Sequence, residues 1–178
     1  MKIKLIAFIG LTLTLFTACT NKSNDIDTSI NEKNTEAIQT NYSPKRQSLP
    51  SFQLVAADGS HINLTDLKGK KIFLNLWATW CPPCRAEIPS IEKLNKKVDK
   101  EKVAFVMLSL DENFELAKQF IQINHMQLPV YYPAENLPAI FNTDGIPATF
   151  IFNEKGELIK VNKGMDNYDT KFYEQLLK

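Results

Sequence analysis

Two almost uninterrupted apolar runs, residues 71–77 and 103–110, dominate the hydrophobic pattern of the chain. Runs that are apolar on both faces are typical of central strands covered by helices on both sides of a sheet. Between them, residues 82–97 carry apolar side chains every three or four positions, which predicts a helix with one buried face. These side chains are Ile88, Ile91 and Leu94, continued by Val98.

Two hairpins are predicted on either side of this strand-helix-strand unit. Residues 52–55 and 61–64 are strand-like and flank an Asp-Gly turn, which predicts a small N-terminal hairpin. Residues 148–152 and 157–161 flank a polar turn that ends in Gly, which predicts a second hairpin near the C-terminus.

Three further helices complete the pattern. Residues 113–124 are predicted to form an amphipathic helix, residues 136–141 a short one, and residues 168–177 the last. The inward side chains of the last helix are predicted to be Phe172, Leu176 and Leu177. This order of elements predicts an α/β fold with a mixed central sheet flanked by helices.

The first 18 residues are interpreted as a targeting segment. Lys2 and Lys4 form a basic start before a largely apolar stretch at residues 5–16, which is short for a membrane span but fits a signal peptide. Small residues then lead into Cys19. This ending resembles a bacterial lipobox, which implies that Cys19 is lipidated and becomes the mature N-terminus. An ordinary secretory signal with a chance cysteine is the alternative.

A change of composition marks the start of the folded domain. Residues 20–46 are rich in Asn, Thr, Ser and mixed charges and have few large apolar side chains. Such a segment cannot bury enough apolar surface to fold, so residues 19–46 are predicted to be a flexible tether with a reach on the order of 30 Å. A folded N-terminal extension is the alternative. Residues 47–178 are then the folded domain.

Composition and cysteine count narrow the function classes. The chain has 178 residues and a formal net charge of +1, which indicates no general attraction to nucleic acid. Its three cysteines are Cys19, Cys81 and Cys84. If Cys19 carries lipid, one close pair remains, and no separate framework of structural disulfides is predicted.

The most informative motif is Trp-Cys-Pro-Pro-Cys at residues 80–84, which follows a buried strand and opens a helix. At that place backbone N–H groups and the helix dipole favour a thiolate, the species that attacks disulfides. Pro82 and Pro83 have no N–H, so donors to the Cys81 sulfur are predicted to come from Cys84 onward.

The motif and its surroundings resemble a known family. The stretches concerned are residues 64–70 (LTDLKGK), 75–89 (NLWATWCPPCRAEIP) and 145–150 (GIPATF). They resemble the thioredoxin superfamily, and more closely the membrane-tethered TlpA/ResA-like thiol-disulfide oxidoreductases of the bacterial envelope. The resemblance implies a thioredoxin-like fold, here with an extra N-terminal hairpin.

Three side chains are expected to carry the chemistry. Cys81 is expected to be the exposed attacking sulfur, and Cys84, one helical turn further in, to resolve the mixed disulfide. Thioredoxin carries a buried, titrating Asp at the position of Asn75, so another group must accept protons here. Glu87 lies three residues after Cys84 on the same helix face, and the family also has an active-site acid there. The alternative is a first-turn Glu that only complements the helix N-terminus.

The resemblance also implies a substrate-binding edge. The family holds a cis-proline opposite the cysteines, which implies a cis bond before Pro147 and backbone contacts from Ile146 to an extended substrate. Trp80 is predicted at the apolar rim beside Cys81, and Trp77 in the core. No role is assigned to Arg85, His125 or Met126.

The predicted function is that of a membrane-anchored thiol-disulfide oxidoreductase of the cell envelope, on the periplasmic side. The resemblance implies that it acts as a reductase and needs no cofactor or metal beyond the Cys81–Cys84 disulfide. The implied partners are envelope proteins with disulfides, apocytochromes c in cytochrome c maturation among them, and a membrane thiol transporter that supplies electrons.

Two other classes of function stay open. A peroxiredoxin-like thiol peroxidase belongs to the same superfamily, but its motif has Thr three residues before the reactive cysteine, where this chain has Ala78 followed by Thr79. A non-catalytic metal- or partner-binding module would use the cysteine pair as half of a zinc site. Its other ligands would have to come from His61 and His125, which are far apart and in no paired motif.

Overall fold

The computed structural model describes residues 47–178 of the chain. The predicted signal peptide, the lipidated Cys19 and the tether lie outside the described residues, and those predictions stand as predictions. Within residues 47–178, no helix is both long and apolar enough to cross a bilayer.

The predicted alternation of strands and helices is present. The elements are β1 (Gln53–Ala56), β2 (His61–Asn63), η1 (Leu64–Leu67), β3 (Lys71–Trp77), α1 (Pro82–Lys97), β4 (Val103–Ser109), α2 (Phe114–Ile123), β5 (Val130–Pro133), η2 (Ala139–Phe141), β6 (Ala148–Phe152), β7 (Leu158–Lys163) and α3 (Lys171–Leu177).

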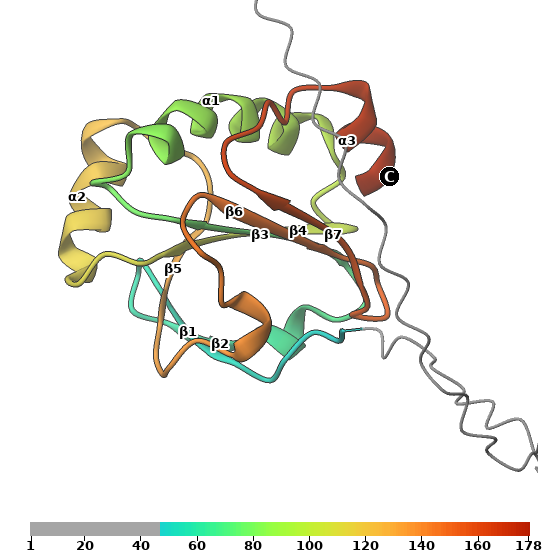
Figure 1. Cartoon of the computed structure of the whole chain (residues 1–178), viewed down its shortest axis with the longest axis horizontal. Coiled ribbons are helices and arrows are strands. Elements are labelled where there is room, and N and C mark those ends of the chain that lie inside the picture. The colour runs from blue at the N-terminus through green and yellow to red at the C-terminus, as the bar shows by residue number, and fades with distance from the viewer. Residues whose placement is uncertain (1–46) are drawn as a thin grey trace, which may run out of the picture. The chain divides into compact units, whose positions relative to one another are not determined.

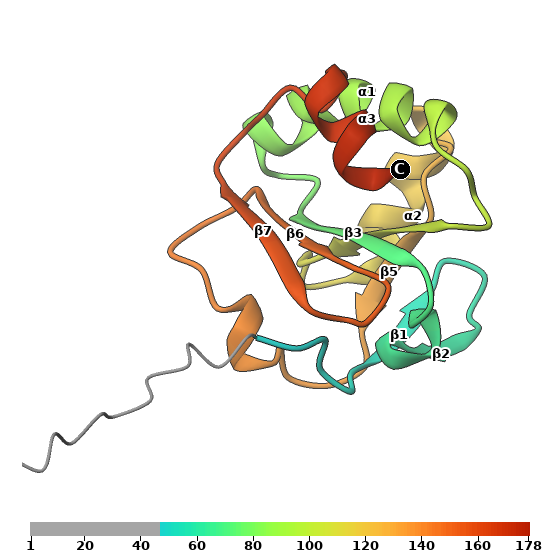
Figure 2. The same ribbon diagram turned by 90° about the vertical axis from the view of Figure 1, so that its right-hand side faces the viewer.

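In this part of the chain, seven strands form one mixed sheet in the order β2-β1-β5-β4-β3-β6-β7. β3 pairs in parallel with β4, and β4 with β5. β6 and β7 are antiparallel to their neighbours, and the β1–β2 hairpin joins the sheet antiparallel to β5. Figure 1 shows the sheet with α1 and α3 on one side and η2 on the other, and Figure 2 shows the same layers after a turn of 90°.

Alternating side chains of β3 enter two separate cores. Phe73 and Trp77 pack with apolar residues of α1, α2 and α3, whereas Ile72 and Leu74 pack on the other face with residues of β1 and η2. Both sets are completely buried, as expected for a strand whose side chains point to opposite faces. Asn75 lies between Phe73 and Trp77 in this alternation, so its polar side chain faces the helical layer.

Strand β5 was missed by the sequence pattern. It has only four residues, ends at Pro133 and follows Pro129, and prolines are uncommon in strand interiors because they lack an N–H. It is nevertheless needed, because it joins β4 to β1.

The last two helices differ from prediction. The short helix is a 3₁₀ turn limited to Ala139–Phe141. The final helix begins at Lys171 rather than near Tyr168, with Thr170 as its N-cap. Phe172 is 55% exposed, so its predicted inward position is wrong, and Tyr173 takes that place in the core.

Candidate active site

The two cysteines of the motif lie where β3 passes into α1, and they form a disulfide. Cys81 is the N-cap of α1 and Pro82 is its first residue, a position that suits proline because no N–H is needed there. The backbone N–H of Cys84 donates to the Cys81 sulfur at 3.2 Å, which agrees with the prediction that donors come from Cys84 onward.

Cys81 is less accessible than expected. It is 3% exposed in this disulfide form, and Cys84 is completely buried. The expectation of an exposed Cys81 sulfur is therefore wrong for the oxidised protein, although Cys81 is still the outer member of the pair. The Cys81 side chain packs into the helix-side core, and the Cys81 N–H donates to the Ala78 carbonyl at 3.2 Å in the turn before α1.

The predicted substrate-binding edge lies against this disulfide. The Ile146–Pro147 peptide bond is cis, and the Ile146 carbonyl oxygen lies 3.8 Å from the Cys81 sulfur. On its other side, the Pro147 carbonyl accepts a 2.9 Å hydrogen bond from the N–H of Gly164. The structure thus brings Cys81 together with residues that are 65 positions away in the sequence.

Trp80 borders a cleft beside this edge, which we call the Trp80 cleft. Its side chain is 64% exposed, whereas Trp77 is completely buried, as predicted for both. The cleft has a volume of about 570 Å³. It is lined by Leu76, Trp80, Leu110, Leu137, Phe141, Asn142, Thr143, Asp144, Gly145 and Ile146. Most of this lining is apolar, so the cleft can accept an apolar side chain of a bound polypeptide.

Glu87 is a buried acid on α1 and is 2% exposed. Its Oε1 accepts a 2.7 Å hydrogen bond from the Asn75 amide, and its Oε2 accepts a 3.1 Å bond from the N–H of Asp166. Burial raises the pKa of Glu87 from 4.5 to about 7, and the two hydrogen bonds oppose part of this shift. Because α1 begins at Pro82, Glu87 lies beyond the first turn, so the alternative of a first-turn Glu is wrong.

A chain of buried polar groups continues from Glu87 across the sheet. The Asn75 amide also donates to the Thr149 hydroxyl at 3.0 Å, and that hydroxyl lies 2.6 Å from the Tyr168 hydroxyl. Burial, followed by the charge of Glu87, raises the pKa of Tyr168, so the phenol stays neutral. The Asn75 Oδ1 atom has no hydrogen-bond partner. Sequence reasoning identified Asn75 as unusual but could not identify Thr149 or Tyr168 as its neighbours.

A second buried acid, Asp111, was missed altogether. It follows β4, is 1% exposed, and accepts hydrogen bonds from the Thr79 N–H (3.1 Å) and the Thr79 hydroxyl (2.6 Å). The Ser109 hydroxyl donates to its other oxygen at 2.8 Å. Asp111 therefore holds the backbone two residues before Cys81. The sequence signal for Asp111 was its place as a polar residue directly after a buried strand, next to the strand that leads into the cysteine motif.

The sequence profile of the Redoxin family matches residues 44–177. The chain belongs to the Redoxin family. The chain is similar to the thioredoxin-like protein YneN of Bacillus subtilis, with 36% identity over 120 residues that make up 66% of this chain and 71% of YneN.

Two further relatives of this Redoxin protein carry the activity in their names. The thiol-disulfide oxidoreductase ResA of Bacillus subtilis is 32% identical over 116 residues, which are 65% of each chain. A thiol:disulfide interchange protein of Chlorobium tepidum TLS superposes with a TM-score of 0.65 and 28% identity, covering 75% of this chain and 97% of that one. Together with the Cys81–Cys84 pair, these findings make the Redoxin protein a thiol-disulfide oxidoreductase with a thioredoxin-like fold.

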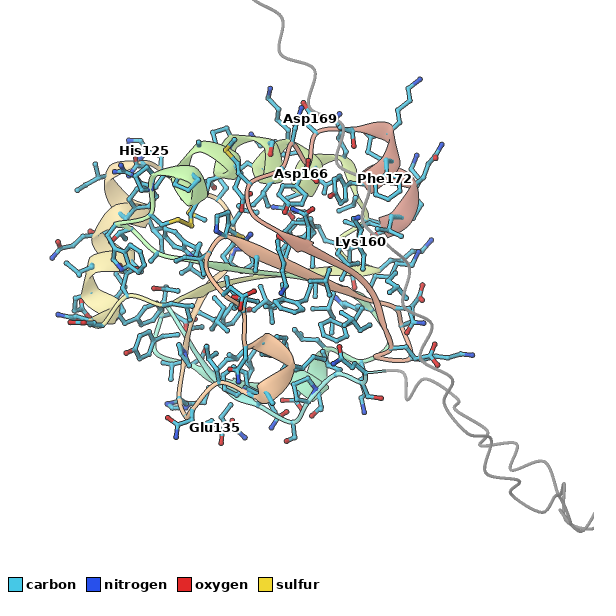
Figure 3. The ribbon with its side chains drawn as sticks, viewed as in Figure 1. His125, Glu135, Lys160, Asp166, Asp169 and Phe172 are labelled. Carbon is cyan, nitrogen blue, oxygen red and sulfur yellow. A yellow bond between two sulfur atoms is a disulfide. The ribbon has the colours of Figure 1, made fainter. Side chains whose placement is uncertain are left out.

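The structure adds no chemistry to the residues that were left without a role. His125 is exposed at the end of α2 (Figure 3), Arg85 is exposed on α1, and Met126 is buried in the helix-side core. Within residues 47–178, no group of three His, Cys, Asp or Glu side chains is placed to hold a metal ion.

Proposed function

We propose that this Redoxin protein is a cell-envelope disulfide reductase, anchored on the periplasmic side of a membrane by lipid on Cys19. The signal-like start and the lipobox-like residues before Cys19 support the anchor. The relationship to ResA and YneN supports the redox activity. No cofactor is needed, because the electrons are held by the cysteine pair itself.

The reaction begins with the dithiol form of the protein. The Cys81 thiolate attacks one sulfur of a client disulfide, which forms a Cys81–client disulfide and expels the other client sulfur as a thiolate. The N–H of Cys84 stabilises the Cys81 thiolate before attack. An extended client strand lies along the Ile146 backbone, and a flanking apolar side chain enters the Trp80 cleft.

The second step needs a base near the buried cysteine. Glu87, in its carboxylate form, takes the proton of the Cys84 thiol, and the Cys84 thiolate then attacks the Cys81 sulfur. This forms the Cys81–Cys84 disulfide and releases the client thiolate, which is protonated by water. The client has gained two electrons and the cysteine pair has lost two.

The cycle closes when another dithiol reduces the Cys81–Cys84 disulfide. In an oxidising compartment that dithiol has to belong to a membrane thiol transporter that carries electrons outward. The clients are envelope proteins with disulfides, and apocytochromes c are candidates because their haem-attachment cysteines must be reduced.

Glu87 is the observation that carries this proposal. It lies one helical turn beyond Cys84, is almost completely buried, and has a pKa of about 7. A base with such a pKa can both take and release a proton at neutral pH. A purely structural disulfide would not need a buried acid near it.

The direct test is disulfide reduction by the soluble domain, residues 47–178, with insulin as client and dithiothreitol as electron source. Wild-type protein should reduce insulin, Cys81→Ser should not, and Cys84→Ser should accumulate a mixed disulfide with the client. A Cys81–Cys84 reduction potential near −270 mV, that of thioredoxin, supports a reductase, whereas one near −120 mV would instead indicate a disulfide donor.

The peroxidase alternative is tested in the same samples. The Thr79 hydroxyl is occupied by its bond to Asp111, so it is not a free donor for a peroxide at Cys81. We expect no consumption of hydrogen peroxide above the rate of Cys81→Ser. Peroxide turnover without insulin reduction would overturn the reductase proposal.

The anchor is tested by mass spectrometry of the mature protein made in a bacterial host. Lipidation predicts an acylated N-terminal Cys19 and recovery with membranes. The variant Cys19→Ala should lose both properties while the isolated domain keeps its activity.

A further inference from the structure

The loop between β7 and α3 reaches back to Glu87 and places a second acid beside it. The N–H of Asp166 donates to Glu87 Oε2 at 3.1 Å. The Asp166 carboxylate is fixed in turn, because it accepts hydrogen bonds from the Asn167 N–H (2.7 Å) and from the Tyr173 hydroxyl. Burial and this hydrogen bond raise the pKa of Tyr173, so the phenol remains a neutral donor. One residue therefore offers Glu87 a dipole that attracts its charge and a carboxylate that repels it.

Asp166 meets Glu87 in a crevice that is separate from the Trp80 cleft. This Asp166 crevice has a volume of about 450 Å³ and lies between α1 and the β7–α3 loop, with Glu87, Ser90, Lys93, Met165, Asp166 and Asp169 among its lining residues. It shares no lining residue with the Trp80 cleft. Figure 3 shows Asp166 and Asp169 together on the helical side of the sheet. A client bound at Ile146 and Trp80 would leave the crevice open to water.

The groups around Glu87 can be assigned by element. β3 and β6 contribute Asn75 and Thr149, which carry no charge. The β7–α3 loop contributes Asp166 and Tyr168, and α3 contributes Tyr173.

The other charges of the crevice neutralise one another. Asp169 pairs with Lys97 at 2.6 Å and with Lys93 at 3.6 Å, and Lys97 also pairs with Glu174 at 2.7 Å. Among the residues described, Asp166 is thus the carboxylate left to act on Glu87.

We propose that Asp166 is a positioning residue for disulfide exchange: its N–H holds the Glu87 carboxylate in place from the β7–α3 loop, and its own carboxylate disfavours the charged form of Glu87 from the crevice side. This assigns a function to a loop residue 79 positions from Glu87. The inference rests on the proposed role of Glu87 as the base for Cys84. Since the crevice is separate from the Trp80 cleft, Asp166 should affect proton transfer without affecting client binding.

The test compares Asp166→Asn with Asp169→Asn in residues 47–178. Asp166→Asn keeps the backbone donor and an oxygen acceptor for Tyr173 but removes the charge. Carbon-13 NMR titration of the Glu87 carboxyl in the disulfide form should show its pKa lowered by roughly half a unit to one unit. Asp169→Asn removes a charge from the same crevice at a residue that does not bond to Glu87, so the Glu87 pKa should shift clearly less than in Asp166→Asn. Superposable curves for Asp166→Asn and wild type would overturn the proposal.

Two additional readouts separate this inference from the proposed function. The titration needs no turnover, so it decides the role of Asp166 even if the wild type fails to reduce insulin. If the wild type is active, Asp166→Asn should shift the pH profile of kcat to lower pH and leave KM for insulin unchanged; a changed KM with an unshifted profile contradicts the proposal. Should Asp166→Asn fail to fold, the carbon-13 signal of the Asp166 carboxyl in the wild type serves instead. This signal must show an inflection at the pH where Glu87 titrates, and a curve without that inflection would refute the contact.

Discussion

Asn75 donates a hydrogen bond from its side-chain amide to Glu87 at 2.7 Å, which joins the central strand β3 to α1, the helix that carries Cys84. A neutral amide at this position leaves Glu87, three residues after Cys84 on α1, as the only acid of this contact. An acid at the position of Asn75 would have to share its proton with Glu87. In the proposed mechanism, this departure from thioredoxin at one residue makes Glu87 the proton acceptor.

The first prediction concerns this hydrogen bond. Asn75→Ala removes a donor to the charged form of Glu87, so the pKa of Glu87 should rise above 7. Carbon-13 NMR titration measures the shift directly. A pKa that fell or stayed constant would show that the amide does not stabilise the carboxylate. The control Thr149→Val removes the other partner of Asn75 and should change the Glu87 pKa less, because Thr149 does not bond to Glu87.

The second prediction is a pH dependence of stability. The pKa of Glu87 is about 7 in the folded protein against 4.5 for an ordinary Glu, so between these values the folded state binds a proton that the unfolded state has released. The free energy of unfolding should therefore fall as pH rises from 4.5 to 7, by on the order of 3 kcal/mol, and then level off. Urea unfolding of the disulfide form at several pH values measures the trend.

Glu87→Gln provides the control for that trend, since the variant has no proton to release. Between pH 4.5 and pH 7, the free energy of unfolding of Glu87→Gln should therefore fall less than that of the wild type. Parallel curves for the two proteins would assign the pH dependence to another group.

The third prediction is kinetic. Glu87→Gln should slow the resolution of the Cys81–client mixed disulfide by roughly a hundredfold at pH 7, because the Cys84 thiol loses its base. Stopped-flow fluorescence with a peptide disulfide measures this step. The initial attack by Cys81 should change much less. An equal loss in both steps would mean that Glu87 supports the site only structurally.

The fourth prediction concerns Asp111. Asp111→Ala leaves the Thr79 N–H and two hydroxyls without their acceptor, which should destabilise the domain by about 2–4 kcal/mol and lower the rate of insulin reduction. Thermal unfolding and the insulin assay measure the two effects. Glu101→Ala, a change of an exposed acid, is the matched control and should stay within about 0.5 kcal/mol of wild type.

The fifth prediction separates client binding from chemistry. Trp80 is largely exposed and borders the Trp80 cleft, so Trp80→Ala should alter stability little while raising KM for a protein client. The reduction of a small disulfide such as oxidised glutathione should be nearly unchanged. A comparable loss for both substrates would place Trp80 in the chemical step instead.

The central part of this fold could be predicted because its sequence signals are local. β3 and β4 are apolar on both faces, and α1 has regular spacing with a cysteine N-cap. β5 could not be predicted because a four-residue strand bounded by prolines owes its existence to its neighbours β4 and β1. The inward face of α3 was predicted wrongly, because Tyr173 and Leu177 are the buried residues of this helix and Phe172 lies on the surface beneath Lys160.

The site shows the same division. Cys81, Cys84 and Glu87 lie within seven residues and on one helix, so spacing alone relates them. Asp111 and Asp166 reach the site from segments that carry no motif, and Thr149, although it lies in the 145–150 stretch, has no sequence spacing that relates it to Asn75. Their roles depend on contacts between residues that are far apart in the sequence, and the sequence pattern alone does not show which residues meet.

Gly164 and Asp166 each donate one backbone bond, the first to the Pro147 carbonyl and the second to Glu87. Gly164 has a φ of +84°, a conformation that side chains rarely adopt, so its identity as well as its place is constrained. Surface loops usually accept insertions and deletions. Here, inserting or deleting one residue between Gly164 and Asp166 would break the hydrogen bond to Pro147 or the one to Glu87. We therefore expect the length of this segment to stay constant in any engineered version of the enzyme.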